Sequence, residues 1–480
     1  MNINIIPTPK RTISENEFVS FPSRIITNYE AWQPLVKVFA ESFEKISEGS
    51  VVQGEGGVEL IFDNSIREGG YILKVKDGIK LYASDYDGAA YSIATVLALV
   101  ETNNENMKCP FVEIEDYPDK KYRALMVDVA RQWHPAVTIY KYIDICFLYK
   151  IKYFHIHFID DQSYTLPSQS FPKISTNGKS YTRDEIQGFN DYARDRGIII
   201  VPEFETPGHA KSLNMAYPDV FSNHISPDTI GSMITENGEL LSADSLICAG
   251  KESAMCAIYT LLQEICEMFP NSPFIHIGGD EADIKLWNEC SVCREYMKQK
   301  NIGDEYELYS EFIARVAKLV LQLGKTPIVW EGFPKQGEKM IPRETIVMAW
   351  ESHYHMPYDL IDEGFKIINC SWQPLYIVNS LEQRWNPLDI MRWNVYNWQH
   401  WWSESEAYLN PVNIAPTENV LGAQLCAWES TYEQEINFIM ENLAALSERT
   451  WNVKRVCCDD EFKTKHKKLM QIVARLITSK

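Results

Sequence analysis

The sequence has a shortage of basic residues and no long run of apolar ones. Its 480 residues include 46 Lys and Arg against 66 Asp and Glu, for a formal net charge of −20 at pH 7. Nucleic acids and anionic membrane surfaces attract basic patches, so we expect neither a nucleic-acid partner nor a membrane partner. The longest apolar stretch, at residues 91–100, is also too short to cross a bilayer.

The marks of a secreted protein are missing as well. The first residues, MNINIIPTPKRTISENEF, contain no basic segment followed by a long apolar one, as a secretory signal would. The eleven cysteines are odd in number and scattered, most of them among apolar residues, which does not resemble a disulfide framework. We therefore expect a cytoplasmic protein, although a mature secreted form would read the same way if its signal had been removed.

The sequence does not predict a metal centre. Cys290 and Cys293 form a C-x-x-C pair, but a zinc ribbon needs a second pair at a suitable spacing. Only the adjacent Cys457 and Cys458 follow, far downstream. We expect free thiols, no metal site and no cofactor.

What the sequence does contain is enough chain for a barrel and a smaller domain, since a (β/α)8 barrel takes roughly 250 to 400 residues. We predict a small α+β domain at residues 1–119 and a catalytic barrel at residues 120–480. In the first part, GVELIFD, GYILKV and GIKLYAS alternate with a period of two, and residues 31–47 and 87–102 have a helical pattern. This part contains no cluster of convergent functional groups, so we predict a structural role for it.

The most informative segment is PFIHIGGDEAD, at residues 273–283. Its β-prone start ends in Gly278 and Gly279, which allow backbone and ligand to approach closely, and then in the adjacent carboxylates of Asp280 and Glu281. Adjacent carboxylates repel each other, so one tends to stay ionised while the other is pushed towards the protonated form that a general acid needs. Taken alone, the segment could also be a solvated acidic strand end.

Similar segments upstream also end in polar residues: YRALMVDVARQW, YFHIHFIDDQ and GIIIVPEFETPGHA. Strands that alternate with helix-length segments, with polar residues at each carboxyl end, are typical of a parallel α/β barrel whose chemistry lies at that face. We predict eight strands, at residues 124–129, 153–159, 198–204, 274–277, 327–330, 345–350, 366–372 and 420–428.

At these residues the chain resembles the family 20 glycoside hydrolases, the β-N-acetylhexosaminidases. The motifs DVAR, HIHFIDDQ, PEFETPGH and HIGGDE occur in that order and at family-like spacing. The resemblance covers about residues 120–450 and, less specifically, residues 1–119. It implies a retaining exo-enzyme that removes terminal β-linked GlcNAc or GalNAc from glycans, so that the expected partner is an N-acetylhexosamine-containing glycan.

The resemblance also implies a role for each acid. Most glycosidases use two carboxylates on opposite sides of the sugar, but a 2-acetamido group can attack C1 itself. Glu281 is then the general acid and base. Asp280 accepts a hydrogen bond from the acetamido N–H and stabilises the oxazolinium-like intermediate.

Three more polar residues have roles by the same resemblance. Arg131, from DVAR, binds ring hydroxyls of the nonreducing sugar, which suits a guanidinium fork. A structural ion pair with Asp128 is the alternative. Asp160 and His209 match a pair that orients the acid, and a satisfied buried histidine is the other reading of His209.

Aromatic residues supply the expected walls of the site. Trp330, Trp350 and Trp428 each end a predicted strand, where indole rings could enclose the sugar and its acetamido methyl. By resemblance, the hydroxyl of Tyr376 bonds the acetamido oxygen.

The sequence departs from the family pattern at two of these positions. After Tyr376 the expected polar residue comes one position late, at Asn379. Glu429 follows Trp428 directly instead of after a one-residue gap. Glu429 is the candidate for binding the 4- or 6-hydroxyl, so these departures leave the choice between GlcNAc and GalNAc open.

Two other functions stay open from the residues alone. His155 and His157 share a strand face, as the ligands of a metal-dependent amidohydrolase barrel would, although hydrogen bonding within the barrel fits them better. A catalytically silent carbohydrate-binding protein would keep the aromatic residues without turnover. The sequence does not indicate an oligomeric state.

Overall fold

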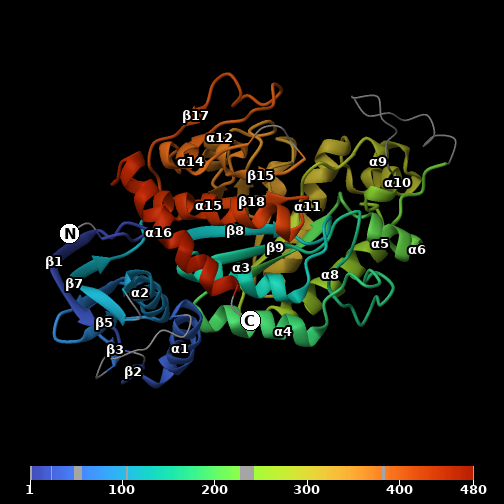
Figure 1. Cartoon of the computed structure of the whole chain (residues 1–480). Helices are drawn as coiled ribbons and strands as arrows, with labels where there is room; N and C mark the ends of the chain where they lie inside the picture. Colours follow the sequence, from blue (N-terminus) through green and yellow to red (C-terminus); the bar gives the residue numbers. More distant parts are fainter. Residues whose placement is uncertain are drawn as a thin grey trace.

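The computed structural model describes residues 3–22, 24–47, 57–103, 106–226, 243–380 and 384–478, without the side chains of residues 102–106. Two sheets organise the chain (Figure 1): a seven-stranded mixed sheet that ends at Asp116 and a parallel barrel that begins at Tyr122. The predicted α/β fold, a (β/α)8 TIM barrel preceded by a small α+β domain, is confirmed. The boundary that we place at residue 119 lies in the link between the sheets and stays a prediction.

The N-terminal domain is a sheet with the strand order β1-β7-β4-β5-β3-β2, in which β6 also pairs with β7. Alternate residues of β4, namely Tyr71, Leu73 and Val75, are buried, as a period of two requires for a sheet with one covered face. The elements are β1 (Arg11–Ser20), β2 (Ile25–Thr27), η1 (Glu30–Trp32), α1 (Gln33–Ser47), β3 (Val58–Phe62), β4 (Tyr71–Val75), β5 (Ile79–Ala83), α2 (Tyr86–Leu99), β6 (Glu101–Asn103) and β7 (Asn106–Asp116).

The barrel closes because β18 pairs with β14 on one side and with β8 on the other, all in parallel. A short extra strand, β15 (Tyr376–Val378), pairs with the carboxyl end of β18 and sets Tyr376 beside Cys426 and Val378 beside Trp428. The eight barrel strands are β8 (Tyr122–Asp128), β9 (Tyr153–His157), β10 (Ile199–Thr206), β11 (Phe274–Gly278), β12 (Thr326–Trp330), β13 (Ile346–Ala349), β14 (Lys366–Asn369) and β18 (Val420–Trp428).

The predicted strand at residues 366–372 is too long, because β14 ends at Asn369. The Asn369 side chain donates to the carbonyl oxygens of Val395 and Asn397 and accepts from the N–H of Ser371 at 2.8 Å, so the chain turns out of the sheet there. Trp372 consequently begins a short helix, α13 (Trp372–Leu375), instead of ending the strand.

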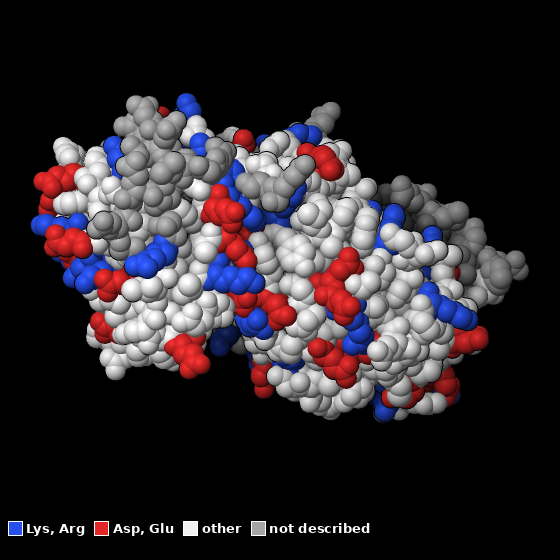
Figure 2. Space-filling model, turned by 60° about the horizontal axis from the view of Figure 1, so that its bottom comes forward, with Lys and Arg blue, Asp and Glu red and all other residues white. Residues whose placement is uncertain are grey.

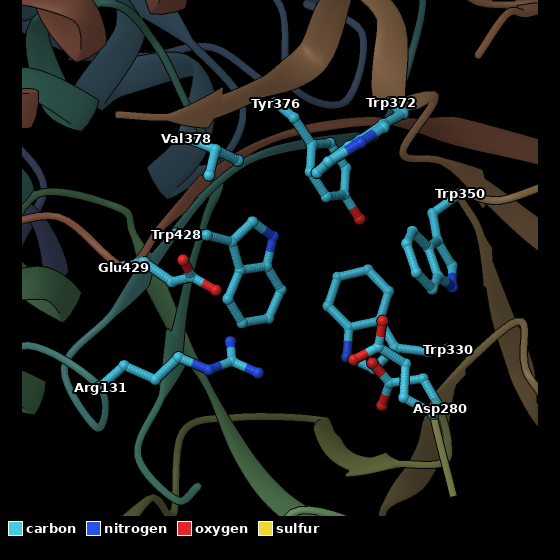
Figure 3. Close-up of a pocket in the computed structure, with 10 residues that line it drawn as sticks. Arg131, Asp280, Trp330, Trp350, Trp372, Tyr376, Val378, Trp428 and Glu429 are labelled. Carbon is cyan, nitrogen blue, oxygen red and sulfur yellow. The ribbon is translucent and has the colours of Figure 1, made fainter. Parts of the chain in front are cut away.

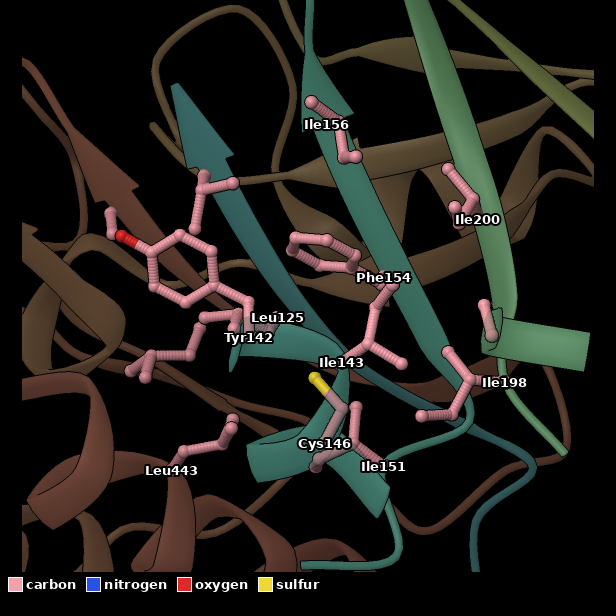
Figure 4. Packing of buried hydrophobic residues seen from close by; sticks show 14 of the residues in the cluster. Leu125, Tyr142, Ile143, Cys146, Ile151, Phe154, Ile156, Ile198, Ile200 and Leu443 are labelled. Atoms are coloured by element: carbon pink, nitrogen blue, oxygen red, sulfur yellow. The ribbon is translucent and has the colours of Figure 1, made fainter. Parts of the chain in front are cut away.

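Helices cover the outside of the barrel. On β8, Leu125 and Val127 pack outwards in the large core, whereas Ala124 and Met126 belong to a second cluster inside the ring. Figure 4 shows residues of the outer core, among them Tyr142 and Leu443 from the surrounding helices. The helices are α3 (Ala136–Leu148), α4 (Arg183–Asp195), α5 (Lys211–Ala216), α6 (Pro218–Phe221), α8 (Glu252–Met268), α9 (Leu286–Glu289), α10 (Ser291–Lys300), α11 (Glu305–Gln322), α12 (Pro357–Asp362), α14 (Pro387–Arg392), α15 (Tyr432–Trp451) and α16 (Asp459–Thr478).

A buried carboxylate, Asp116, joins the two domains. Its oxygens accept hydrogen bonds from the hydroxyl of Tyr71 at 2.7 Å and from the indole N–H of Trp451 at 2.8 Å. The ammonium of Lys150, on the turn after α3, lies 3.2 Å from the same carboxylate. Burial lowers the pKa of Lys150, and the charge of Asp116 opposes that shift. The N-terminal domain is thus fixed to the barrel through a paired, buried charge.

Acidic and basic side chains are interspersed over the face drawn in Figure 2 rather than gathered by sign. Among the helices that the structure describes, none combines the length and the apolar character needed to cross a bilayer.

Candidate functional site

A pocket with a cavity volume of about 100 Å³ opens where the barrel strands end (Figure 3). Its polar and aromatic walls come from β12, α13, β15 and β18 and from the segments that follow β8, β11, β13 and β18. Residues that lie far apart in the sequence therefore meet in one place. The lining residues are Arg131, Asp280, Glu281, Trp330, Trp350, Trp372, Tyr376, Val378, Trp428 and Glu429.

Indole rings form most of the pocket wall. The indole N–H of Trp330 donates to Glu203 at 2.6 Å, and that of Trp350 donates to the carbonyl oxygen of Glu331 at 2.7 Å. These bonds fix the two rings in the wall of the pocket. The Tyr376 ring stacks on Trp350 with an interplanar angle of 15°, and Figure 3 shows its hydroxyl pointing into the pocket. Burial raises the pKa of Tyr376 well above its ordinary value, so the hydroxyl keeps its proton and can donate.

Arg131 and Glu429 lie together on the side of the pocket away from Asp280 (Figure 3). Arg131 pairs with Asp160 at 2.9 Å and lies 3.6 Å from Asp128, so the structural ion pair that we considered is present although the guanidinium also lines the pocket. Asp128 also accepts from the backbone N–H of Glu429 at 3.3 Å. That bond joins the segments after β8 and β18. It places the Glu429 carboxylate beside the Arg131 guanidinium at the rim of the pocket.

The carboxylate pair sits on a tightly shaped turn after β11. A Cβ atom at Gly278 would lie 1.8 Å from an oxygen of Glu205, so only glycine fits there. Glu281 has a backbone φ of 44°, in the left-handed region. Non-glycine residues rarely adopt that conformation, which is frequent at functional sites. The turn aims both Asp280 and Glu281 into the pocket.

Asp160 and His209 do not line the pocket but lie behind its acids. The His209 ring is 3.6 Å from Asp160 on one nitrogen and 3.5 Å from Glu281 on the other. Burial lowers the pKa of His209, but the nearby carboxylates of Asp160 and Glu281 outweigh it and raise the pKa well above its ordinary value. Burial alone would raise the pKa of Asp160. His157, His209 and Arg131 nevertheless hold that pKa well below the usual range. A charged chain therefore runs from Asp160 through His209 to Glu281.

The two acids of the turn have separated pKa values, as the sequence predicts, but in the free pocket the direction differs from the assigned roles. Burial raises the pKa of Asp280 to about 6, with Glu281 adding to the rise and His209 opposing it. The adjacent His209 ring lowers the pKa of Glu281. Without a ligand, the proton that a general acid needs is held by His209, next to Glu281.

The His-x-His segment lies deeper in the barrel and does not line the pocket. His157 contacts Glu203 at 2.5 Å and Asp160 at 3.0 Å, and the ring of His155 lies 3.2 Å from Glu203. Glu203 also accepts the hydrogen bond from the indole N–H of Trp330. These histidines therefore organise the groups beneath the pocket, which is the reading that the sequence favours over an amidohydrolase site.

Several residues of the site were missed in the sequence. Trp372 and Val378 line the pocket, and Trp372 could have been found because it ends a predicted strand, as the three chosen tryptophans do. Val378 takes the place of the expected polar residue, while the amide of Asn379 turns away to the hydroxyl of Ser430 at 2.8 Å.

Nothing in the sequence indicated that Glu331 belongs to the site. It is buried, and its carboxylate accepts from the backbone N–H groups of residues 351–355 at 2.9–3.3 Å. It thereby fixes the segment that follows Trp350. Burial and the charge of Glu331 raise the pKa of Glu351, on that segment, to about 9.

A closed parallel barrel with paired carboxylates and a tryptophan-walled pocket at its strand ends defines a carbohydrate-active barrel protein. The particular family follows from sequence comparison. The chain belongs to glycosyl hydrolase family 20, since the model of that family's catalytic domain matches residues 121–454 and the model of its domain 2 matches residues 2–117.

Similar sequences include proteins named as β-hexosaminidases. The chain is 32% identical to a beta-hexosaminidase of Porphyromonas gingivalis over 382 residues, which cover 72% of this chain and 47% of that protein. It is 27% identical to a beta-hexosaminidase subunit beta of Entamoeba histolytica over 471 residues, or 92% of this chain and 80% of that one. The chain thus spans about half the length of the bacterial relative.

Solved structures share the fold. An exo β-N-acetylglucosaminidase of Vibrio harveyi, in complex with N-acetylglucosamine, superposes with a TM-score of 0.83 at 21% identity and covers 98% of this chain and 77% of its own. A β-N-acetylhexosaminidase of Bacteroides fragilis gives a TM-score of 0.77 at 23% identity, with 96% and 93% covered.

Proposed function

We propose that this protein is a retaining exo-β-N-acetylhexosaminidase that hydrolyses terminal β-linked GlcNAc or GalNAc from glycans by substrate-assisted catalysis. The observation that carries the proposal is the position of Asp280 and Glu281 on one turn beside one pocket. Neighbours in sequence are poorly placed to flank a glycosidic bond from opposite faces, as the usual pair of carboxylates does. A nucleophile supplied by the substrate's 2-acetamido group removes that requirement. The family and the names of its relatives support the same reaction.

Asp280 acts on the acetamido group. With a pKa of about 6, its carboxylate is mostly ionised at neutral pH. It accepts a hydrogen bond from the acetamido N–H and turns the amide oxygen towards C1, and its charge stabilises the oxazolinium ion that forms as the C1–O bond breaks. Tyr376, which keeps its proton, donates to the acetamido oxygen, and the indole rings enclose the methyl group.

Glu281 protonates the leaving oxygen. In the free pocket it is the anion of a pair with protonated His209. When a glycan covers the pocket and displaces water, the neutral pair becomes more favourable, because a charged pair is costlier in a drier site. The proton then passes from His209 to Glu281 and on to the departing oxygen. Glu281 afterwards takes a proton from the water that opens the oxazolinium ring, and this restores the acid.

A panel of substrates tests the proposal. We expect β-N-acetylglucosaminides or β-N-acetylgalactosaminides to be turned over and plain β-glucosides to be nearly inert, because the latter lack the nucleophile. A thiazoline mimic of the oxazolinium ring should inhibit competitively. Comparable kcat/KM for plain glucosides would refute the mechanism, and no turnover of any member would favour the carbohydrate-binding alternative.

A further inference from the structure

Three buried cysteines from two separate segments meet at one point. Cys248 lies between η2 (Ala243–Ser245) and α8, whereas Cys290 caps the start of α10 and Cys293 is in its first turn. The sulfur of Cys248 is 3.7 Å from that of Cys290 and 3.5 Å from that of Cys293. All three sulfur atoms lie within 4.8 Å of one another, and each side chain is fully buried.

These sulfur distances fit the corner-to-corner spacing of a zinc tetrahedron. Zinc–sulfur bonds of about 2.3 Å place tetrahedral sulfur atoms about 3.8 Å apart. A disulfide would need about 2.05 Å between two sulfur atoms and would leave the third cysteine without a partner. The geometry therefore points to one centre shared by all three thiols.

The backbone around the cysteines is shaped for the same centre. The N–H of His224 donates to the sulfur of Cys290 at 3.2 Å, a bond that favours the thiolate form of a metal ligand. At Gly250 a Cβ atom would come within 2.9 Å of the Cα of Cys293, so the two segments can approach this closely only because residue 250 is glycine.

We propose that Cys248, Cys290 and Cys293 bind a structural zinc ion as thiolates and supply three of its four ligands. Cysteine thiolates are characteristic ligands of structural zinc. Each cysteine loses its thiol proton on binding, so three thiolates and one Zn²⁺ together carry one net negative charge. The C-x-x-C pair looked incomplete in the sequence because its third partner lies 42 residues upstream of Cys290 rather than in a second pair.

The ion would connect the two segments that carry the groups behind the pocket. The segment after β10 holds His209 and returns through Ile247, whose N–H donates to the carbonyl of Pro207 at 2.9 Å. The segment after β11 holds Glu281 and continues into Trp287, whose indole N–H donates to the carbonyl of Ile247 at 2.9 Å. None of the three cysteines lines the pocket. The role of the ion is therefore to hold these segments together, and it takes no part in the chemistry.

Metal analysis of the purified full-length chain tests the site. We expect about one zinc ion per chain, a ratio that falls to about a tenth or less in Cys248→Ser, Cys290→Ser and Cys293→Ser. Cys256→Ser, which changes an exposed thiol on α8, is the matched control and should keep its zinc.

Cobalt substitution covers the case in which the variants fail to fold. The unaltered chain, stripped of zinc and given Co²⁺, should develop thiolate-to-cobalt charge-transfer absorption and the visible bands of a tetrahedral ion. The stripped chain should also unfold at a lower temperature than the zinc-loaded one. Failure to bind either metal, or an intact mass lower by two hydrogens under denaturing, non-reducing conditions, would overturn the proposal. None of these readouts depends on the proposed glycosidase activity.

Discussion

Asp280 and Glu281 are adjacent in the chain, yet they have different surroundings. Asp280 is buried, and burial raises its pKa. The Glu281 side chain is 58% exposed and is held as an anion by protonated His209. Substituting the two acids should therefore have different effects on the reaction.

We expect Glu281→Gln to depend on the leaving group. A sugar leaves only with protonation, so its kcat/KM should fall by roughly 10²- to 10⁴-fold, while an activated nitrophenyl group should lose much less. Asp280→Asn should slow both substrates similarly, by about 10²- to 10³-fold, because it weakens orientation and charge stabilisation of the acetamide attack. The measurement is the ratio of the two kcat/KM values in each variant, and equal ratios in both would show that the acid is wrongly assigned.

The pKa of Asp280 predicts the acidic limb of the pH profile. The reaction needs the ionised carboxylate, which is lost as the pH falls through about 6. In the wild type, kcat/KM for a nitrophenyl substrate should therefore decline below about pH 6 as Asp280 takes up a proton. The limb should vanish in Asp280→Asn, which cannot titrate at that position. If the limb persists there unchanged, another group controls it.

At the scale of secondary-structure elements, the walls of the pocket depend on segments that leave the strands. The segment after β13 is held by the Glu331 carboxylate, which accepts from backbone N–H groups of residues 351–355. A buried acceptor of this kind costs about 1–3 kcal/mol to remove, because the donors lose their partner. Trp350 lies at the start of this segment, so the segment's order determines the shape of the aromatic wall.

Glu331→Gln should loosen that wall. A glutamine side chain offers one acceptor oxygen and adds donors facing other donors. We expect KM to rise severalfold with a smaller change in kcat, together with a melting temperature lower by several degrees. Glu344→Gln, an exposed carboxylate just before β13, is the matched control. Equal kinetic constants in the two variants would mean that the segment keeps its shape without Glu331.

The sequence predicted the barrel because alternation and apolar strand starts are local signals. It placed the strand ends well enough to bring Arg131, Trp330 and Trp428 to one pocket. The missed features depend on contacts between distant segments. The strand β14 ends early because the Asn369 side chain donates to the carbonyl oxygens of residues 395 and 397. Val378 lines the pocket in place of a polar residue, because the amide of Asn379 bonds to Ser430 instead. Neither partner could be identified from spacing along the chain.

At the scale of the whole molecule, Asp116 is a buried charge at the junction between the domains. Removing one member of a buried ion pair leaves an uncompensated charge, at a cost of about 3–5 kcal/mol. Asp116→Asn leaves the ammonium of Lys150 in that position. The neighbouring pair of Arg11 and Glu115 is exposed and separated by 3.8 Å, so it contributes little.

We expect Asp116→Asn to reduce the free energy of unfolding by about 3–5 kcal/mol in urea titrations, and Glu115→Gln to change it by less than about 1 kcal/mol. The loss should shrink as pH rises. Burial lowers the pKa of Lys150 in the folded state, and removing the Asp116 charge that opposes this shift lowers it further. The variant therefore gains stability faster than the wild type as the pH rises towards the pKa of lysine in the unfolded chain. A loss that is equal in both variants, or independent of pH, would contradict this role for the pair.

The same junction has a consequence for biosynthesis. Asp116 and the indole of Trp451 are separated by 335 positions in the chain. The N-terminal sheet is therefore synthesised long before α15, the helix that carries Trp451. Until that helix is made, Asp116 and Lys150 stay in contact with water. A nascent chain released before residue 451 would contain every acid of the pocket and most of the barrel. It would nevertheless lack the Trp451 donor to Asp116, so quality control could recognise it by that exposed junction rather than by its active site.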